Sequence, residues 1–376
     1  MKFIIAPDSF KGSLTAQQAA DAMKEGILRA IPDATCITVP MADGGEGTVR
    51  SLVDATAGRM ITVTVTDPLG RPTNAEYGIL GDGRTAVIEM AAASGLQFVN
   101  ENTRNPLITT TYGTGELIRN ALDHGIRDII VGLGGSATND GGAGMAQALG
   151  VRLLDDSGQP LPFGGAALRD LKTIDCSGID GRLNDTRIRL ASDVRNPLTG
   201  AHGASAVFGP QKGATETMVK QLDAALAHYA AVINEQLGRN VADIPGSGAA
   251  GGLGAGFLAF TSARMQSGIS MVVETTGLKS KAVDADYCFT GEGSIDEQTQ
   301  YGKTPVGTAQ AVKQVSPNAK VVAIAGHVGD GIDELYGLGI DAVFGMMPGV
   351  GTMQDAIAGA YANLARTAEN VARLIR

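Results

Sequence analysis

The feature that most constrains the fold is a unit that recurs along the chain: a short apolar run, then glycine or a polar turn, then a helical pattern. In the first example, Phe3–Ala6 is followed by Pro7–Gly12 and by a helix that begins with the capping pattern Thr15-x-x-Gln18. Short runs without alternation are typical of strands buried on both faces of a parallel sheet. Further runs begin at Ile37, Ile129, Ile188, Tyr287, Val321 and Ala342. The pattern predicts an α/β fold.

A different pattern interrupts this series near residue 61. Residues 61–65, 75–80 and 85–89 form runs around tight turns, the first of them alternating apolar residues with threonine, which is typical of antiparallel hairpins. The segments on either side hold five strand runs, enough for one flavodoxin-like parallel sheet. We therefore expect residues 1–60 plus 284–376 to form one domain and residues 61–283 to form an inserted, mixed α/β domain. A simple division near residue 185 is the alternative.

The strongest helical patterns cover residues 216–237 and 353–375. In the first, the apolar residues recur at three- and four-residue intervals, which places them on one buried face. Gly238 follows directly and is the expected C-cap. Each of the two segments is expected to form one continuous helix.

Charge and cysteine content exclude several classes of protein. The net charge is -9 at pH 7 without a Lys/Arg-rich run, which argues against nucleic acid as a partner. Cys36, Cys176 and Cys288 are widely spaced, so neither a disulfide framework nor a zinc site is expected. Pro7 ends the first apolar run too early for a signal peptide, and the uncharged segment 244–263 is too rich in glycine for a membrane span. We expect a cytoplasmic protein without a membrane partner.

Polar residues gather in the loops that follow the predicted strands. In an open parallel sheet these loops meet in one crevice, where helix N-termini bind anions. Acids, lysines and glycine-lined backbone amides suit magnesium-assisted phosphoryl transfer. A single Asp there is often only a helix N-cap, so the interpretation depends on their joint occurrence. The loop residues are Asp8, Ser9, Lys11, Asp43, Glu46, Ser136, Asn139, Asp140, Asp193, Arg195, Asn196, Glu292, Asp296 and Lys303.

Roles for these residues follow from the chemistry of phosphoryl transfer to a hydroxyl group. We expect Asp193 to position the attacking hydroxyl and Lys11 to contact the transferring phosphoryl group, both as catalytic residues. The magnesium candidates are Asp8, Glu292 and Asp296. The candidates for substrate binding are Ser9, Arg195, Asn196 and Lys303. The phosphates of ATP are expected at Gly134, Gly135, Ser136, Asn139, Asp140 and Gly141.

Two short motifs that could suggest other nucleotide-binding folds do not fit. Gly302-Lys303-Thr304 resembles the end of a P-loop, but Glu297 stands where that loop requires glycine. Gly246–Gly251 matches GxGxxG but does not follow a strand, so a nicotinamide oxidoreductase lacks its fingerprint. The remaining alternative is a non-catalytic sensor of a small acid or nucleotide. The many acids on successive loops argue against it, because anion binding alone favours fewer negative charges.

Several longer motifs together resemble the bacterial type-I glycerate kinases. They are Ala6–Lys11, Ala42–Thr48, Glu89–Gly95, Gly134–Gly142, Phe208–Ala214 and Gly291–Gly293, and they span nearly the whole chain. The resemblance implies ATP-dependent phosphorylation of D-glycerate at the 2-hydroxyl to 2-phosphoglycerate, in the breakdown of glyoxylate or sugar acids. It also implies a flavodoxin-like domain interrupted by a second α/β domain. We expect the active site in the cleft between these domains, which would close on the substrates.

Two positions depart from the pattern of that family. Ser294 stands where the family has an arginine, and Ser192 stands where it has a cysteine. An arginine can bind a phosphate or carboxylate with two parallel hydrogen bonds. Either that arginine is not essential, or Lys303 or Arg195 takes its place.

Overall fold

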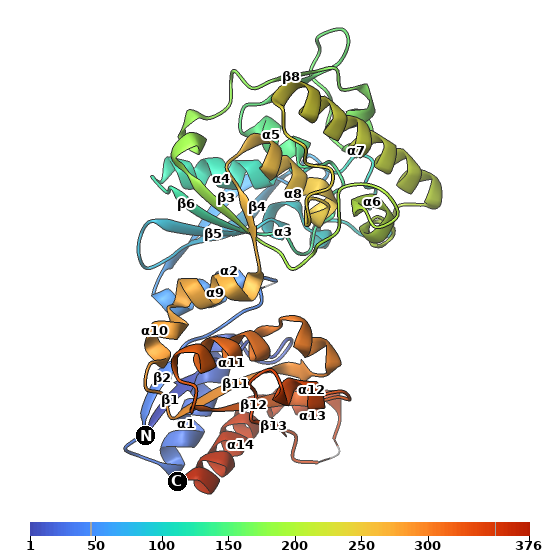
Figure 1. Cartoon of the computed structure of the whole chain (residues 1–376). Helices are drawn as coiled ribbons and strands as arrows, with labels where there is room; N and C mark the ends of the chain where they lie inside the picture. The colour runs from blue at the N-terminus through green and yellow to red at the C-terminus, as the bar shows by residue number, and fades with distance from the viewer. Residues whose placement is uncertain (46, 350) are drawn as a thin grey trace. The chain divides into compact units, whose positions relative to one another are not determined.

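The computed structural model describes residues 1–45, 47–349 and 351–376. Glu46, which the sequence grouped with Asp43, lies outside the described residues. The chain divides into two compact units, of which unit 1 comprises Met1–Gly58 with Gly268–Arg376 and unit 2 comprises Arg59–Ser267 (Figure 1). Each unit contains helices and a sheet, so the expected α/β fold class is confirmed.

The second boundary lies at Ser267, whereas the sequence placed it at residue 283. The difference consists of two short helices, α9 (Gly268–Thr276) and α10 (Leu278–Ala282). Both contact α11 (Thr304–Val315), and α9 also contacts α2 (Thr48–Thr56). Their packing onto helices from both chain segments of unit 1 places them there.

The sheet of unit 1 has five strands, all parallel, in the order β13-β12-β11-β1-β2. The strands are β1 (Lys2–Ile5), β2 (Thr35–Thr38), β11 (Tyr287–Ile295), β12 (Lys320–Val328) and β13 (Ala342–Gly345). Numbered along the unit, this order is 2-1-3-4-5, in which the winding reverses between the first and third strands. β1 therefore pairs with β11, with Phe3 opposite Tyr287 and Ile5 opposite Phe289.

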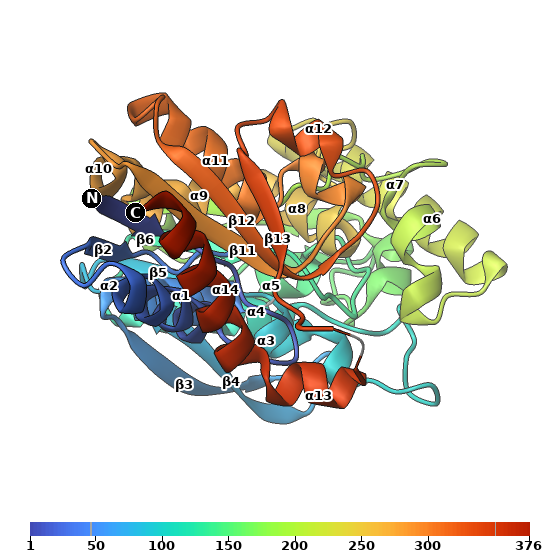
Figure 2. The same cartoon turned by 90° about the horizontal axis from the view of Figure 1, so that it is seen from below.

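Helices cover both faces of this sheet (Figures 1 and 2). On one face α1 (Ala16–Ala30) packs against α14 (Ala360–Ile375), and both contribute to a core with Phe3 and Phe289. On the other face α11 contacts β11. The predicted capping box begins α1: the Thr15 hydroxyl accepts from the Gln18 N–H at 3.1 Å, and the Gln18 side chain accepts from the Thr15 N–H at 2.9 Å. The short helix α12 (Asp333–Tyr336) precedes β13.

The segment 353–375 forms two helices, so the prediction of one continuous helix is wrong. α13 (Met353–Ala358) ends at Gly359, and α14 begins at the next residue. Glycine is a weak helix former, and the buried face of α14 packs on α1 whereas α13 has no buried residue. The break therefore frees α13 from the direction that packing imposes on α14.

Unit 2 contains a mixed sheet of six strands in the order β10-β9-β6-β5-β4-β3. The strands are β3 (Arg59–Thr66), β4 (Pro72–Ile79), β5 (Thr85–Glu89), β6 (Asp128–Gly132), β9 (Arg187–Ala191) and β10 (Arg264–Gln266). β3, β4 and β5 pair antiparallel, as their sequence pattern predicts. β5, β6, β9 and β10 are parallel, so their carboxyl ends lie at the same edge of the sheet.

Two apolar cores support unit 2. The first lies between the sheet and the helices α4 (Tyr112–Asp123) and α8 (Ala249–Phe260). The second joins α7 (Glu216–Leu237) to the hairpin of β7 (Arg152–Leu154) and β8 (Thr173–Asp175). α7 has its predicted bounds, and Gly238 caps it with φ 66°. The remaining α-helices are α3 (Ala91–Ser94), α5 (Ala143–Ala148) and α6 (Ala204–Phe208).

None of the helices that the structure describes combines the length and the hydrophobicity that a membrane span requires. Cys36, Cys176 and Cys288 are not paired in disulfides. The interior of each unit is held by apolar packing and hydrogen bonds.

Candidate active site

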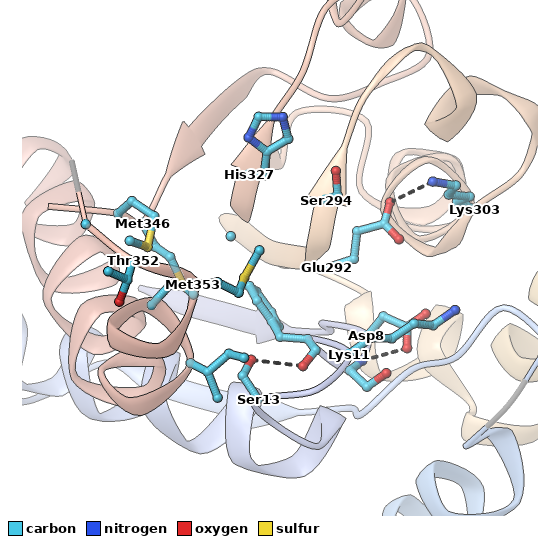
Figure 3. Close-up of a pocket in the computed structure, with 18 of the residues that line it drawn as sticks. Asp8, Lys11, Ser13, Glu292, Ser294, Lys303, His327, Met346, Thr352 and Met353 are labelled. Carbon is cyan, nitrogen blue, oxygen red and sulfur yellow. Dashed lines mark hydrogen bonds and ion pairs between the residues drawn. The ribbon is translucent and has the colours of Figure 1, made fainter. Parts of the chain in front are cut away.

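A cavity of about 730 Å³ lies in unit 1 near the carboxyl ends of its strands (Figure 3). In parallel sheets with this strand order, ligands bind at the point where the winding reverses, which here is between β1 and β11. The polar residues that line the cavity are Asp8, Ser9, Lys11, Ser13, Asp43, Glu292, Ser294, Lys303, Thr352 and His327. The structure therefore brings together five of the predicted site residues of unit 1: Asp8, Ser9, Lys11, Glu292 and Lys303.

Asp8 is held in the lining of this cavity by neighbours on two elements. Its backbone N–H donates to the Gly291 carbonyl at 2.8 Å, which fixes the loop after β1 against β11. Its carboxylate accepts from the Thr304 hydroxyl at 2.5 Å and from the Ser9 N–H at 2.6 Å. Burial raises the pKa of the Asp8 carboxyl to about 6, the Thr304 hydrogen bond opposes this shift, and the charge of Asp43 adds to it.

Glu292 faces the same space from β11. Its carboxylate accepts from the Thr299 hydroxyl at 3.2 Å and lies 4.0 Å from the Lys303 ammonium. Burial raises the pKa of Glu292 to about 7, Lys303 opposes the shift, and Asp8 and Asp43 add to it. Negative charge is therefore crowded in this part of the cavity.

The third magnesium candidate, Asp296, is not among the residues that line the cavity. It is the N-cap of the 3₁₀ helix Glu297–Tyr301, and its side chain accepts from the Gln298 N–H at 2.9 Å. Lys303 lies 3.9 Å from it. The carboxylate that joins Asp8 and Glu292 in lining the cavity is Asp43, whose side chain accepts from the Gly45 N–H. In the sequence, the position of Asp43 directly after the second predicted strand indicated that it could line the site.

The carboxylates fit a magnesium ion bound together with phosphate. Among the residues that the structure describes, no group of three or more His, Cys, Asp or Glu side chains could by itself hold a metal ion. Mg²⁺ commonly binds one or two carboxylates and completes its shell with water and substrate phosphates. The pKa values of Asp8 and Glu292 are raised first by burial and further by neighbouring negative charge, and a bound cation would offset both effects. Asp8 and Glu292 are therefore the best candidates for the protein ligands of a magnesium ion.

His327 and Ser294 lie opposite each other on neighbouring strands of the cavity wall. β12 extends to Val328, so His327 lies within the strand and pairs in register with Ser294 of β11. The His327 side chain is exposed and lines the cavity (Figure 3). An arginine at position 294, which the resemblance implied, would stand opposite this histidine in register.

We expect His327→Gln to leave the shape of the pH–rate profile unchanged. The imidazole is exposed, whereas Glu292, whose pKa is raised to about 7, can account for a limb near neutral pH. The measurement is kcat/KM from pH 5.5 to 8.5 for the wild type and for the His327→Gln and Glu292→Gln variants. Loss of a limb in His327→Gln would instead identify the histidine as a proton-transfer group.

In unit 2 the predicted loops leave neighbouring strands at one edge of the sheet. Glu89, Gly132 and Ala191 are adjacent in register at the ends of β5, β6 and β9. Gly134 and Gly135 after β6 are exposed, and Ser136 pairs with Gly95 in an isolated β-bridge. After β9, Asp193 and Arg195 are exposed, while the Asn196 side chain donates to the His202 carbonyl at 2.8 Å. The two loops are therefore neighbours, as the sequence predicted.

Asn139 and Asp140 are fully buried, which differs from the expected contact with ATP phosphates. The Asp140 carboxylate accepts from the N–H and hydroxyl of Thr111 at 2.8 and 2.9 Å, and from the N–H groups of Gly142 and Gly144 at 3.1 and 3.2 Å. The Asn139 amide donates to the Ser205 hydroxyl at 2.9 Å. Asp140 thus joins the beginning of α4 to the beginning of α5, because it satisfies N–H groups that a helix leaves unpaired. Its role in the structure is to shape the loop.

Lys212, which is not among the residues predicted for the site, also holds this loop. The side chain is 1% exposed, and its ammonium donates to the Thr138 carbonyl at 2.7 Å. Burial lowers the pKa of Lys212 to about 7, with Asp140 opposing the shift. The same carbonyl lies 2.0 Å from where a Cβ on Gly251 would be, so only glycine fits there. The signal was the motif Phe208–Ala214, which contains this lysine.

We expect replacement of Lys212 by methionine to change how stability depends on pH. Between about pH 7 and pH 10 the unfolded chain holds a proton on this lysine that the folded protein has released, so Lys212 makes stability rise with pH. The contribution is on the order of 1 kcal/mol per pH unit and would be absent in Lys212→Met. Denaturant unfolding at pH 7, 8 and 9 measures it, with Lys220→Met on the exposed face of α7 as the control. Parallel pH dependences for both variants would contradict a buried, shifted Lys212.

Comparison with known proteins gives one consistent result. Residues 3–376 match the model of the Glycerate kinase family. A protein of Escherichia coli (strain K12) named glycerate 2-kinase is 50% identical over 372 residues, which cover 99% of this chain and 97% of the relative. The glycerate kinase of Bacillus subtilis (strain 168) is 53% identical over 376 residues, covering 100% and 98%. A crystal structure from Salmonella typhimurium LT2, assigned as a glycerate kinase 2, superposes with a TM-score of 0.91 at 50% identity, covering 100% and 98%.

Proposed function

The chain belongs to the glycerate kinase family, and from this premise we propose that it transfers the terminal phosphoryl group of ATP to the 2-hydroxyl of D-glycerate, with the help of a magnesium ion. It is an ATP-dependent glycerate kinase, and the product would be 2-phosphoglycerate. The resemblance found in the sequence is therefore confirmed at the level of the family. With unpaired cysteines and a small organic acid as substrate, we propose that it works in the cytoplasm.

The observation that carries this proposal is the pairing of lysines and carboxylates in the unit 1 cavity. Lys11 and Lys303 would neutralise the phosphate oxygens, and Asp8 and Glu292 would hold the magnesium ion. When bound, the ion would stabilise the charge that develops on the transferring phosphoryl group. Ser9, whose N–H already binds the Asp8 carboxylate, would hold the loop after β1 in place for the substrate.

In unit 2 we propose that Asp193 positions the 2-hydroxyl and that Arg195 binds the glycerate carboxylate. Both are exposed and follow β9, which supports access to a small substrate. Asn196 would orient this loop through its bond to the His202 carbonyl. The N–H groups of the exposed residues Gly134 and Gly135 are the proposed phosphate contacts, together with Ser136. Asn139, Asp140 and Gly141 would support this loop from within.

The finer features of the fold are also part of the proposal. The strand order of unit 1 supports a flavodoxin-like domain, with residues 59–267 as the inserted domain. Binding of the substrates in a cleft between the domains, and closure of that cleft, stay predictions. At Ser294 we propose that Lys303, which also lines the cavity, supplies the positive charge of the absent arginine.

The test is an ADP-release assay with D-glycerate, followed by identification of the product. Enolase consumes 2-phosphoglycerate directly, whereas 3-phosphoglycerate must first be converted by a mutase. We expect ADP release that depends on both D-glycerate and Mg²⁺, with a product that enolase accepts without mutase. Binding of D-glycerate or ATP without ADP release would favour the sensor and contradict the kinase. A product that requires mutase would contradict transfer to the 2-hydroxyl.

A further inference from the structure

The cavity of unit 1 has an apolar end that neither phosphate nor glycerate requires. Met346 and Met347 follow β13 and line the cavity, and Met353 and Ile357 line it from α13. Figure 3 shows Met346 and Met353 on the side of the cavity away from Lys303. The cavity is therefore charged at one end and apolar at the other.

The apolar side chains of α13 are exposed without a protein partner that buries them. Met353 is 77% exposed and Ile357 is 44% exposed, and α13 has no buried residue. A capping box fixes the first turn, because the Thr352 hydroxyl accepts from the Asp355 N–H at 3.1 Å and donates to the Asp355 carboxylate at 2.6 Å. α13 thus presents apolar groups to the cavity from a defined helix start.

Methionine is well suited to cover a flat aromatic ring. Its side chain is flexible and polarizable, and its sulfur makes favourable contacts with aromatic systems. Binding pockets for small molecules are mostly apolar with a few polar groups that orient the ligand, and they enclose roughly 300–1,000 Å³. The volume of about 730 Å³ suits a nucleotide, whereas glycerate is small and polar throughout.

We propose that the purine base of ATP binds against Met346, Met347, Met353 and Ile357, with the triphosphate extending toward Lys11 and Lys303. This inference rests on the proposed function only for the identity of ATP as the phosphoryl donor. ATP has a flat base at one end and a multiply charged triphosphate at the other, which matches the division of the cavity. α13 then acts as the wall that selects for the base.

The test separates binding of the base from binding of the phosphates. The variant is Met353→Gln with Ile357→Gln, which removes apolar side chains without adding charge. Because α13 buries no residue, we expect this variant to fold as the wild type does. Calorimetry with the full-length protein compares a non-hydrolysable ATP analogue with inorganic tripolyphosphate, both with Mg²⁺. The control is Leu374→Gln, which is 79% exposed on α14 and lines a neighbouring cavity that shares only Met346 and Met347 with this one.

We expect the double variant to bind the ATP analogue about tenfold more weakly, to bind tripolyphosphate as the wild type does, and to keep the KM for D-glycerate. Unchanged affinity for the analogue would overturn the proposal, as would equal weakening of tripolyphosphate, which would show general damage to the cavity. A stronger effect of Leu374→Gln would place the base elsewhere and also overturn it. Failure of the proposed function is seen separately, because the wild type would then bind the analogue but release no ADP with D-glycerate.

Discussion

Replacing Lys11 by alanine is expected to lower kcat/KM by on the order of 10²-fold or more, with almost no change in stability. Lys11 lines the unit 1 cavity and its side chain is exposed, so its removal leaves the packing of the fold intact. The loss arises because a fixed positive charge at the transferring phosphoryl group is worth most in the transition state. Steady-state kinetics with D-glycerate and ATP measure the effect, and thermal unfolding measures stability.

Lys279→Ala is the matched control for this variant. Lys279 is an exposed lysine of α10 in the same unit, and it does not line the cavity. We expect its kinetics to equal those of the wild type, and we expect Lys11→Arg to recover part of the activity because it restores the charge. Near-normal kinetics in Lys11→Ala would show that Lys11 is only a solvated lysine before a helix.

Replacing Glu292 by glutamine is expected to move activity and stability in opposite directions. Activity should fall by on the order of 10²-fold, because a proposed magnesium ligand is lost. The ligand-free protein should become more stable near pH 8 by about 1–3 kcal/mol, because the neutral amide would place no buried charge beside Asp8 and Asp43. Stability and function would therefore compete at this position.

The sign of the pH dependence follows from the raised pKa of Glu292. Below about pH 4.5 the Glu292 carboxyl is protonated in both the folded and the unfolded state, so it does not change the free energy of unfolding with pH. Between pH 4.5 and about 7 the unfolded chain releases a proton that the folded protein keeps, so this residue makes stability fall as pH rises. Thermal unfolding from pH 5 to 8 should show a smaller fall in Glu292→Gln than in the wild type.

Glu297→Gln is the control for charge removal, because Glu297 is exposed and does not line the cavity. We expect it to change neither the activity nor the pH dependence of unfolding. A Glu292→Gln protein that is fully active would contradict the metal-binding role. A Glu292→Gln protein that is less stable than the wild type at pH 8 would contradict the idea that the buried charge of Glu292 destabilises the ligand-free protein.

Much of the fold could be predicted because its signals are local. The alternating residues of β3 give the hairpin with β4 directly, and the apolar runs give the parallel strands. The second boundary could not be predicted, because it depends on the packing of α9 and α10 against α11. The break at Gly359 is a similar case, since only the contact of α14 with α1 shows where helical packing ends.

The candidate site was predictable in its location but not in every role. The position of Asp8 after a strand places it at the carboxyl edge of the sheet, as strand order requires. Asp296 and Asp140 also follow strands, but in the structure Asp296 caps a helix and Asp140 is buried against Thr111. A sequence does not show whether a polar group points into a cavity or into the interior, because that depends on distant partners such as Thr111.

The pairing of β1 with β11 has a consequence for how the protein is made. β1 and β2 are translated before unit 2, yet β11, the neighbour of β1, is translated only after the whole of Arg59–Ser267. Unit 2 is contiguous in the chain, so it can form its core as soon as Arg59–Ser267 has been translated. The apolar face of α1 can be covered only by α14, which is translated after unit 2. Unit 1 can therefore complete its sheet and the core under α1 and α14 only after the whole of unit 2 has been translated.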